Sequence, residues 1–121
     1  MAMTVPLLGA WEGTDNLRNL RGLFIFTEET HVGLWVGADR KPFAAEEPTE
    51  AEEAAAYRTL RAAGGKYVVS GSSVIMALEY HRVPDPPDPI PTITFEFKLD
   101  GDHLVFATKS GWILDMHKVK G

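Results

Sequence analysis

Two pairs of ionisable side chains stand at spacings that suit proton-transfer chemistry. Glu79 and His81 are two residues apart, and Asp115 and His117 repeat this spacing near the C-terminus. Residues i and i+2 of a β-strand point to the same face, so each pair would place a carboxylate beside an imidazole. Such a pair can move a proton in an isomerisation or cyclisation. We therefore take Glu79, His81, Asp115 and His117 as candidate catalytic residues.

Solvent exposure is the simpler explanation for both pairs. Polar residues that alternate with apolar ones on an antiparallel strand usually face water. Glu79 and His81 alternate with Leu78 and Tyr80 in this way. The sequence favours exposure, whereas an ionisable side chain inside a dry cavity would favour catalysis. A register error of one residue reverses every face, so the assignment of faces decides between the two interpretations.

Aromatic residues supply candidate walls for a ligand pocket. Small-molecule sites are mostly apolar, with a few polar groups that orient the ligand. Trp35 follows Gly33 on one face of a predicted strand, and the glycine leaves space beside the ring. Packing in the core is the alternative role for each aromatic residue. The candidate ligand-binding residues are Trp35, Phe43, Tyr57, Tyr80 and Trp112.

Several classes of site lack the residues that they need. The chain has no cysteine, which excludes disulfides, thiolate metal ligands and a cysteine nucleophile. Its four histidines show no close metal-binding spacing, so we predict no metal site. A dispersed set of His31, His81 and His117 is the metal arrangement that stays open, because distant strands meet in a barrel. No phosphate loop or dinucleotide fingerprint is present, and we expect no cofactor.

Length and charge narrow the class of protein further. The 121 residues suffice for one domain, residues 1–121. The formal net charge of −5 and the scattered lysines and arginines argue against partners that are nucleic acids or anionic membranes. We find neither a signal peptide nor an apolar run of the roughly 20 residues that span a membrane. The expected location is therefore cytoplasmic.

Most of the chain reads as short strands joined by turns. Apolar runs and alternating segments indicate strands, and Gly71-Ser72 and Asp100-Gly101 are typical of hairpin turns. The apolar run Leu23–Phe26 predicts a strand buried on both sides. One small barrel covers one side of such a strand, so a homodimer that covers the other is an open alternative. Residues 84–91 form a proline-rich loop that cannot lie inside a sheet.

One segment has the signals of a helix. Thr49 and Glu52 match a capping box, and acidic residues fill the first turn. Gly64-Gly65 is a natural stop, so we predict a helix over about residues 50–63. This helix would cover an opening of the fold and bring Tyr57 towards a ligand.

Sequential hairpins with one helix favour a closed architecture. About eight strands in this order hide their edges best by closing into a barrel, which at this size holds one small ligand or a filled core. The fold class that we predict is all-β, a single antiparallel up-and-down barrel.

Four segments in order resemble the bacterial lipocalin-like domain family. They are Gly9-Ala10-Trp11, Gly22–Thr27 with His31 after the turn, Ala62–Tyr67, and Leu99–Leu104. The resemblance covers nearly the whole chain and implies a lipocalin-like β-barrel with a pocket. It also implies that Trp11 closes one end of the barrel, with Lys118 or Lys120 packed on its ring.

The chain departs from that family at a pair of histidines. Relatives often carry paired histidines where this sequence has Met76 and Ala77, and Glu79 remains nearby. The resemblance therefore implies a container more than an activity. The function that we expect is binding of a small apolar or aromatic molecule in the lumen. The alternative is a cofactor-independent isomerase or cyclase that acts on a hydrophobic, natural-product-like substrate.

Overall fold

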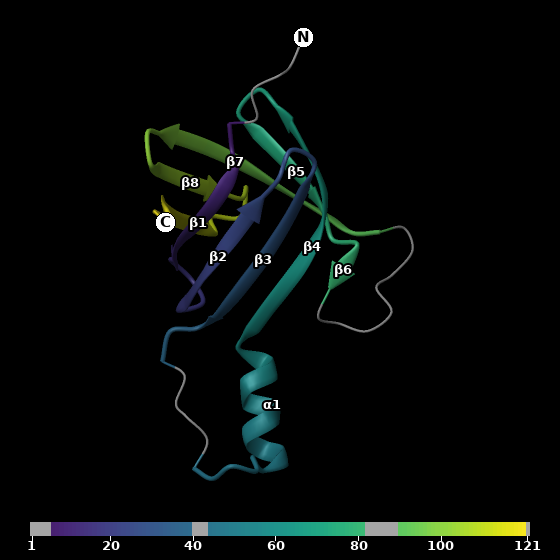
Figure 1. The fold of residues 1–121 in the computed structure, drawn as a ribbon, viewed down its shortest axis with the longest axis vertical. Coiled ribbons are helices and arrows are strands. Elements are labelled where there is room, and N and C mark those ends of the chain that lie inside the picture. Colours follow the sequence, from purple (N-terminus) through teal and green to yellow (C-terminus); the bar gives the residue numbers. More distant parts are fainter. Residues whose placement is uncertain (1–5, 40–43, 82–89, 121) are drawn as a thin grey trace.

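The computed structural model describes residues 6–39, 44–81 and 90–120, and of His81 it describes the backbone (Figure 1). Within these residues the chain forms nine strands and one helix. The elements are β1 (Gly9–Asp15), β2 (Leu20–Phe26), β3 (Thr30–Gly37), α1 (Glu50–Arg58), β4 (Leu60–Ser70), β5 (Ser73–Ala77), β6 (Tyr80–His81), β7 (Thr92–Asp100), β8 (His103–Ala107) and β9 (Ile113–Lys118).

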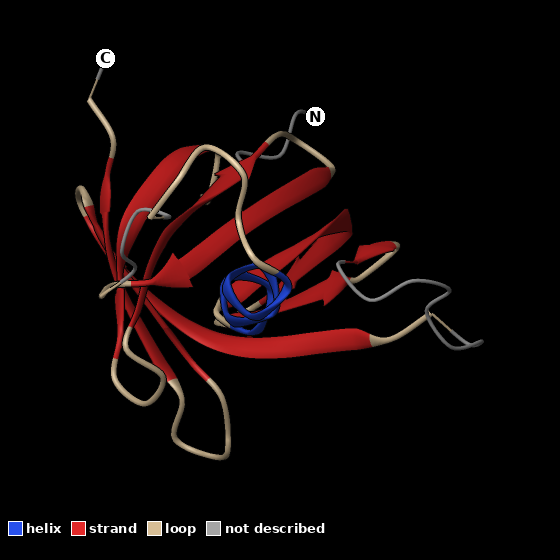
Figure 2. Cartoon of the chain, turned by 90° about the horizontal axis from the view of Figure 1, so that it is seen from below, coloured by secondary structure: helices blue, strands red, loops and turns tan. Residues whose placement is uncertain are grey.

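Eight of these strands close into an antiparallel barrel. The strand order is β3-β2-β1-β9-β8-β7-β5-β4, and β4 pairs back onto β3 to complete the ring. The short strand β6 pairs with β4 beside the end of β5. Figure 2 shows the strands curving around a common interior. The predicted all-β barrel of about eight strands with one helix is confirmed.

Large apolar side chains fill the closed end of the barrel. The inward positions of each strand alternate with outward ones, as a half-buried sheet requires. Trp11 is buried, its indole N–H donates to the Leu7 carbonyl oxygen at 2.9 Å, and Lys118 Nζ lies 5.4 Å from its ring centre. The expected contact of a lysine with the Trp11 ring is thus confirmed for Lys118, whereas Lys120 pairs with Asp102.

The helix is shorter than the sequence predicts. The capping box is present, with Thr49 Oγ1 accepting from the Glu52 N–H and the Glu52 carboxylate accepting from the Thr49 N–H. The helix ends at Arg58 rather than near residue 63, because residues 60–66 pair with β3 and close the barrel. Gly64-Gly65 therefore lies within β4 and does not stop the helix.

The helix continues the line of β4 away from the barrel end (Figure 1). Across Glu50–Arg58, which the structure describes completely, no residue is buried. The helix accordingly stands at this opening without packing into it. Leu60 and Ala63, which the predicted helix included, belong to β4.

Two further expectations about strands need correction. The run Leu23–Phe26 is not buried on both sides: Phe24 and Phe26 face the core, but Ile25 is 45% exposed on the outer face. The alternation around Glu79 and His81 predicts one strand from about residue 73 to residue 83, but β5 ends at Ala77 and β6 begins at Tyr80. Residues 84–89 of the proline-rich loop lie outside the described residues.

In the part of the chain that the structure describes, no helix has the length and apolar character of a membrane span.

Candidate functional site

A cavity of about 220 Å³ lies inside the barrel, and its lining includes the start of β4, directly after the helix. Most of its walls are aromatic or aliphatic, and a few polar side chains reach it. Its lining comprises Arg18, Phe24, His31, Gly33, Trp35, Arg61, Ala62, Ala63, Met76, Leu78, Ile93, Phe95 and Trp112. The lining residues come from β2, β3, β4, β5, β7 and the segments next to them, and from Trp112 just before β9. Closure of the barrel therefore assembles the site.

Two glycines let the aromatic walls approach the backbone. A Cβ atom on Gly22 would overlap the Leu34 carbonyl oxygen and lie 2.8 Å from Trp35 Cδ2. A Cβ atom on Gly33 would lie 2.5 Å from Phe24 Cε1. The Phe24 and Trp35 ring centres are consequently 5.6 Å apart. The small residues in β2 and β3 thus make room for two rings that line the cavity.

His31 is the ionisable residue that reaches deepest into this wall. Its side chain is 1% exposed, and its Nε2 lies 2.8 Å from the Ala77 carbonyl oxygen. A carbonyl oxygen only accepts hydrogen bonds, so Nε2 carries the proton and donates it. Burial lowers the pKa of His31, although the Ala77 hydrogen bond and the Glu79 charge oppose the shift. The neutral ring then presents the lone pair of Nδ1 as an acceptor.

Two buried polar atoms of the cavity residues lack a protein partner. Among the described residues, neither His31 Nδ1 nor Trp35 Nε1 has a hydrogen-bond partner. Trp35 is 4% exposed, so its indole N–H is a buried donor, as His31 Nδ1 is a buried acceptor. Leaving a buried polar group unpaired costs about 1–3 kcal/mol, so both atoms favour a bound partner.

Trp112 and Arg18 form the rim of the cavity. The Trp112 indole N–H donates to Asp15 Oδ2 at 2.8 Å, and the Arg18 guanidinium lies 5.4 Å from the Trp112 ring centre. Burial would raise the pKa of Asp15, but hydrogen bonds from the Leu20 backbone and Trp112 hold it below its ordinary value. Asp15 therefore stays ionised and fixes the Trp112 ring at the rim.

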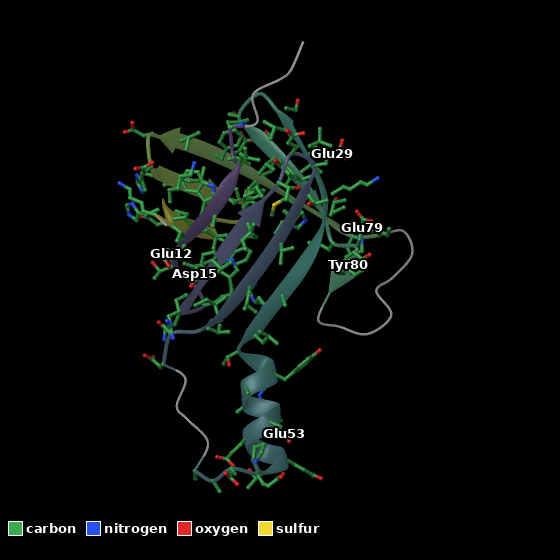
Figure 3. The ribbon with its side chains drawn as sticks, in the orientation of Figure 1. Glu12, Asp15, Glu29, Glu53, Glu79 and Tyr80 are labelled. Atoms are coloured by element: carbon green, nitrogen blue, oxygen red, sulfur yellow. The ribbon has the colours of Figure 1, made fainter. Side chains whose placement is uncertain are left out.

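Only some of the five predicted ligand-binding residues line the cavity. Trp35 and Trp112 line the cavity. Tyr80 is 77% exposed on the outside of the barrel (Figure 3). Tyr57 is 42% exposed on the helix, and neither tyrosine lines the cavity. Tyr80 instead borders a shallow apolar groove on the outer side of β3 and β4. Phe43 lies outside the described residues.

Glu79 has a structural partner outside the cavity lining. Its carboxylate accepts a hydrogen bond from the Lys66 backbone N–H at 2.8 Å, at the point where β4 changes partner from β5 to β6. Glu79 is half-buried and affects His31 through its charge. The side chain of His81 lies outside the described part of the structure.

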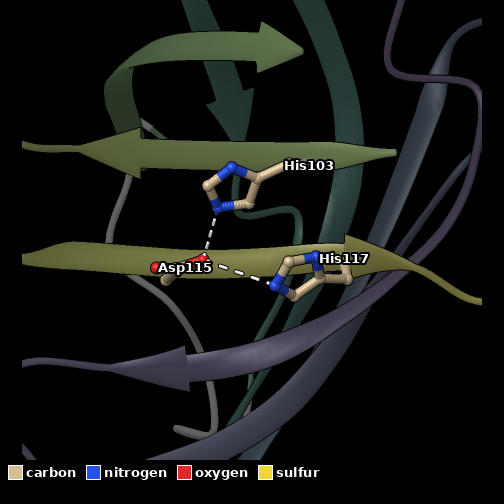
Figure 4. A group of neighbouring side chains, drawn as sticks. All are labelled: His103, Asp115 and His117. Carbon is tan, nitrogen blue, oxygen red and sulfur yellow. Dashed lines mark hydrogen bonds and ion pairs between the residues drawn. The ribbon is translucent and has the colours of Figure 1, made fainter. Parts of the chain in front are cut away.

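Asp115 and His117 face outward on β9, as the solvent interpretation expects (Figure 4). His103 on β8 joins them: its Nε2 lies 2.7 Å from Asp115 Oδ1. The predicted set of His31, His81 and His117 does not form a cluster with the described side chains, because His31 faces the lumen and His117 faces solvent.

Sequence reasoning considered His31 only in a dispersed metal set and did not predict it as a cavity residue, and it missed His103. His31 follows a turn. One face of its strand carries His31, Gly33 and Trp35 and the other carries Val32 and Leu34, so apolar residues stand on both faces and do not show which one points inward. Its position on the same face as Gly33 and Trp35 was the available signal. His103 is 14 residues from His117, and the β8–β9 pairing brings them together.

Comparison with protein families, with curated proteins and with solved structures found no match for this chain.

Proposed function

We propose that this chain is a lipocalin-like barrel that binds a small apolar or aromatic molecule in its lumen. The observation that carries the proposal is the aromatic-lined cavity of about 220 Å³ with two unpartnered buried polar atoms, His31 Nδ1 and Trp35 Nε1. Stable cores rarely retain unpaired polar atoms, and ligand sites place a few of them in apolar walls. The order of the four lipocalin-like segments supports the same role.

The dimensions of the cavity limit the size of the ligand. A cavity of about 150 Å³ accepts benzene, so about 220 Å³ suits one or two fused rings. The polar atoms define its hydrogen bonds: a donor on the ligand pairs with His31 Nδ1, and an acceptor pairs with Trp35 Nε1. Arg18 and Arg61 at the wall offer positive charge to polar substituents.

The first test is native mass spectrometry of the chain as purified from cells, compared with its denatured mass. A retained small molecule identifies the ligand class. Naphthalene and naphthol are then titrated into the ligand-free chain while the indole N–H resonances of its three tryptophans are recorded. Saturable shifts of Trp35 and Trp112, without a shift of Trp11 at the closed end, are expected.

A variant that fills the cavity provides the control. Ala63→Leu adds three carbons to the cavity lining, whereas Ala10→Leu adds them to the outer side of β1, opposite the exposed Ile25. Ala63→Leu should abolish binding of both probes and Ala10→Leu should retain it. If the chain carries no molecule from cells and neither probe shifts Trp35, the proposed binding function is wrong.

A second candidate function, a cofactor-independent isomerase or cyclase, is favoured by His31. His31 lines the cavity, its Nε2–H is held by the Ala77 carbonyl, and its Nδ1 is buried without a partner. A neutral imidazole in this state can accept a proton at Nδ1 from a substrate that reaches it. His31 would take the role first considered for Glu79 and His81.

His31→Gln distinguishes the two functions. The glutamine amide N–H can keep the hydrogen bond to Ala77, but the Nδ1 acceptor is lost. For a binding protein, the variant should bind naphthalene as the wild type does. For an enzyme, turnover of a substrate identified by screening should fall by about 10²-fold or more, with naphthalene binding unchanged.

A further inference from the structure

The β8–β9 hairpin brings two histidines directly opposite each other on the outer surface. His103 is the register partner of His117. The backbone N–H of Lys118 donates to the Asp102 carbonyl oxygen at 2.8 Å, which makes His103 and His117 a non-hydrogen-bonded pair. Side chains approach most closely at such pairs, where the Cα atoms are about 4.5 Å apart. The two imidazole rings accordingly stack, with centres 4.8 Å apart and planes at 16°.

Asp115 completes a group of three donor atoms (Figure 4). Its Oδ1 lies 2.7 Å from His103 Nε2 and 4.0 Å from His117 Nε2. All three donor atoms lie within 4.8 Å of one another. Tetrahedral zinc, with bonds of about 2.0–2.1 Å, holds its ligand atoms roughly 3.3 Å apart. The observed separations bracket this value, so small side-chain rotations suffice to form the site.

We propose that the outer face of the β8–β9 hairpin binds one Zn²⁺ ion through His103 Nε2, Asp115 Oδ1 and His117 Nε2. The half-exposed to exposed positions of these side chains leave the fourth coordination position to water. Two imidazoles and one carboxylate form a donor set that suits Zn²⁺, whereas Ca²⁺ and Mg²⁺ prefer oxygen ligands alone.

An acidic neighbour favours a cation at this place. Glu12 on β1 is the register partner of His117 and faces outward beside it. Asp102, which precedes His103, is instead paired with Lys120 Nζ at 3.1 Å. Zinc would replace the hydrogen bond between His103 Nε2 and Asp115 Oδ1 and would tie β8 to β9.

The proposed zinc site is independent of the lumen. Leu104, Leu114 and Met116 alternate with the three ligands and point into the core. The cavity lining includes none of the zinc ligands. Zinc binding can therefore succeed or fail without bearing on ligand binding inside the barrel.

The test is isothermal titration calorimetry of the untagged full chain with ZnCl₂ after treatment with a chelator. We expect one Zn²⁺ per chain. His103→Gln and His117→Gln should each weaken binding by about tenfold or more, because each removes one of three ligands. His81→Gln is the matched control, since it removes a histidine outside the β8–β9 hairpin, and it should leave the affinity unchanged.

A spectroscopic measurement covers the case in which a variant alters folding. Long-range proton–nitrogen spectra of the wild-type imidazoles should show Nε2 of both His103 and His117 shifting on addition of one equivalent of Zn²⁺. Their shifts should occur without a change in the His31 signals. Zinc binding that is absent, or that survives unchanged in the His103→Gln/His117→Gln double variant, would overturn the proposal.

Discussion

Acidification should destabilise this barrel through His31, and the substitution His31→Gln should remove the effect. Burial lowers the pKa of His31 below 6.5, so on acidification the imidazole is protonated more readily in the unfolded chain than in the folded chain. The free energy of unfolding rises with pH wherever the unfolded state binds more protons. Stability contributed by the neutral imidazole is therefore present above about pH 6.5 and is lost as the pH falls through that value.

The size of the effect has an upper limit. A histidine that protonates only in the unfolded chain lowers the free energy of unfolding by about 1.4 kcal/mol between roughly pH 7.5 and 5.5. The charge of Glu79 reduces this value, because it favours the protonated ring. The lowered pKa values of Asp15, Glu52 and Glu96, which hydrogen bonds stabilise as carboxylates, act at lower pH.

Urea unfolding of the wild type and His31→Gln at several pH values provides the assay. Glutamine retains a donor for the Ala77 carbonyl, so any constant difference between the two chains reports packing and not titration. The wild type should lose about 1 kcal/mol more than the variant over the interval. A difference that stays constant with pH, or that grows in favour of the wild type on acidification, would refute the buried neutral imidazole.

Three further substitutions test the packing of the barrel and the cap of the helix. Gly22→Ala should lower the free energy of unfolding by about 3 kcal/mol in urea, since its methyl group would overlap the Leu34 carbonyl oxygen. Trp11→Phe should cost about 2 kcal/mol in the same assay, because it leaves the buried Leu7 carbonyl without its donor. Thr49→Ala should remove about 1 kcal/mol of helix stability and weaken the helical circular dichroism signal, with little change in the urea midpoint of the barrel, because the helix buries no residue.

The barrel could be predicted because its signals are local. Alternation in β7, the turn at Asp100-Gly101 and the capping box at Thr49 each depend on a few neighbouring residues. The residue at which the helix ends could not be predicted in this way, because it is determined by pairing with β3, a strand distant in the sequence. Residues 60–63 have fair helical signals, but pairing with β3 closes the barrel and satisfies their backbone groups, which outweighs local propensity.

The candidate sites depended on pairings that the sequence does not encode locally. Trp35 could be placed because Gly33 stands beside it on the same strand. His103 and His117 meet through the register of a hairpin, and a period-two pattern within one strand cannot reveal a partner on the next. Tyr80 was misplaced because the chain breaks between β5 and β6, which reverses the alternation after Ala77.

The unpaired atoms of the lumen argue for a ligand with two polar groups. His31 and Trp35 are four residues apart on β3, so their Cα atoms are separated by about 13 Å along the strand. One position offers an acceptor and the other a donor, and apolar side chains would have avoided the cost of burying either unpaired. A ligand that pairs with even one of these atoms recovers part of that cost. We therefore expect naphthol to bind at least about tenfold more tightly than naphthalene. Its single hydroxyl reaches one of the two atoms, so one of the variants His31→Gln and Trp35→Phe should remove the difference and the other should retain it. Equal affinity for the two probes in the wild type would mean that neither polar atom contributes to recognition.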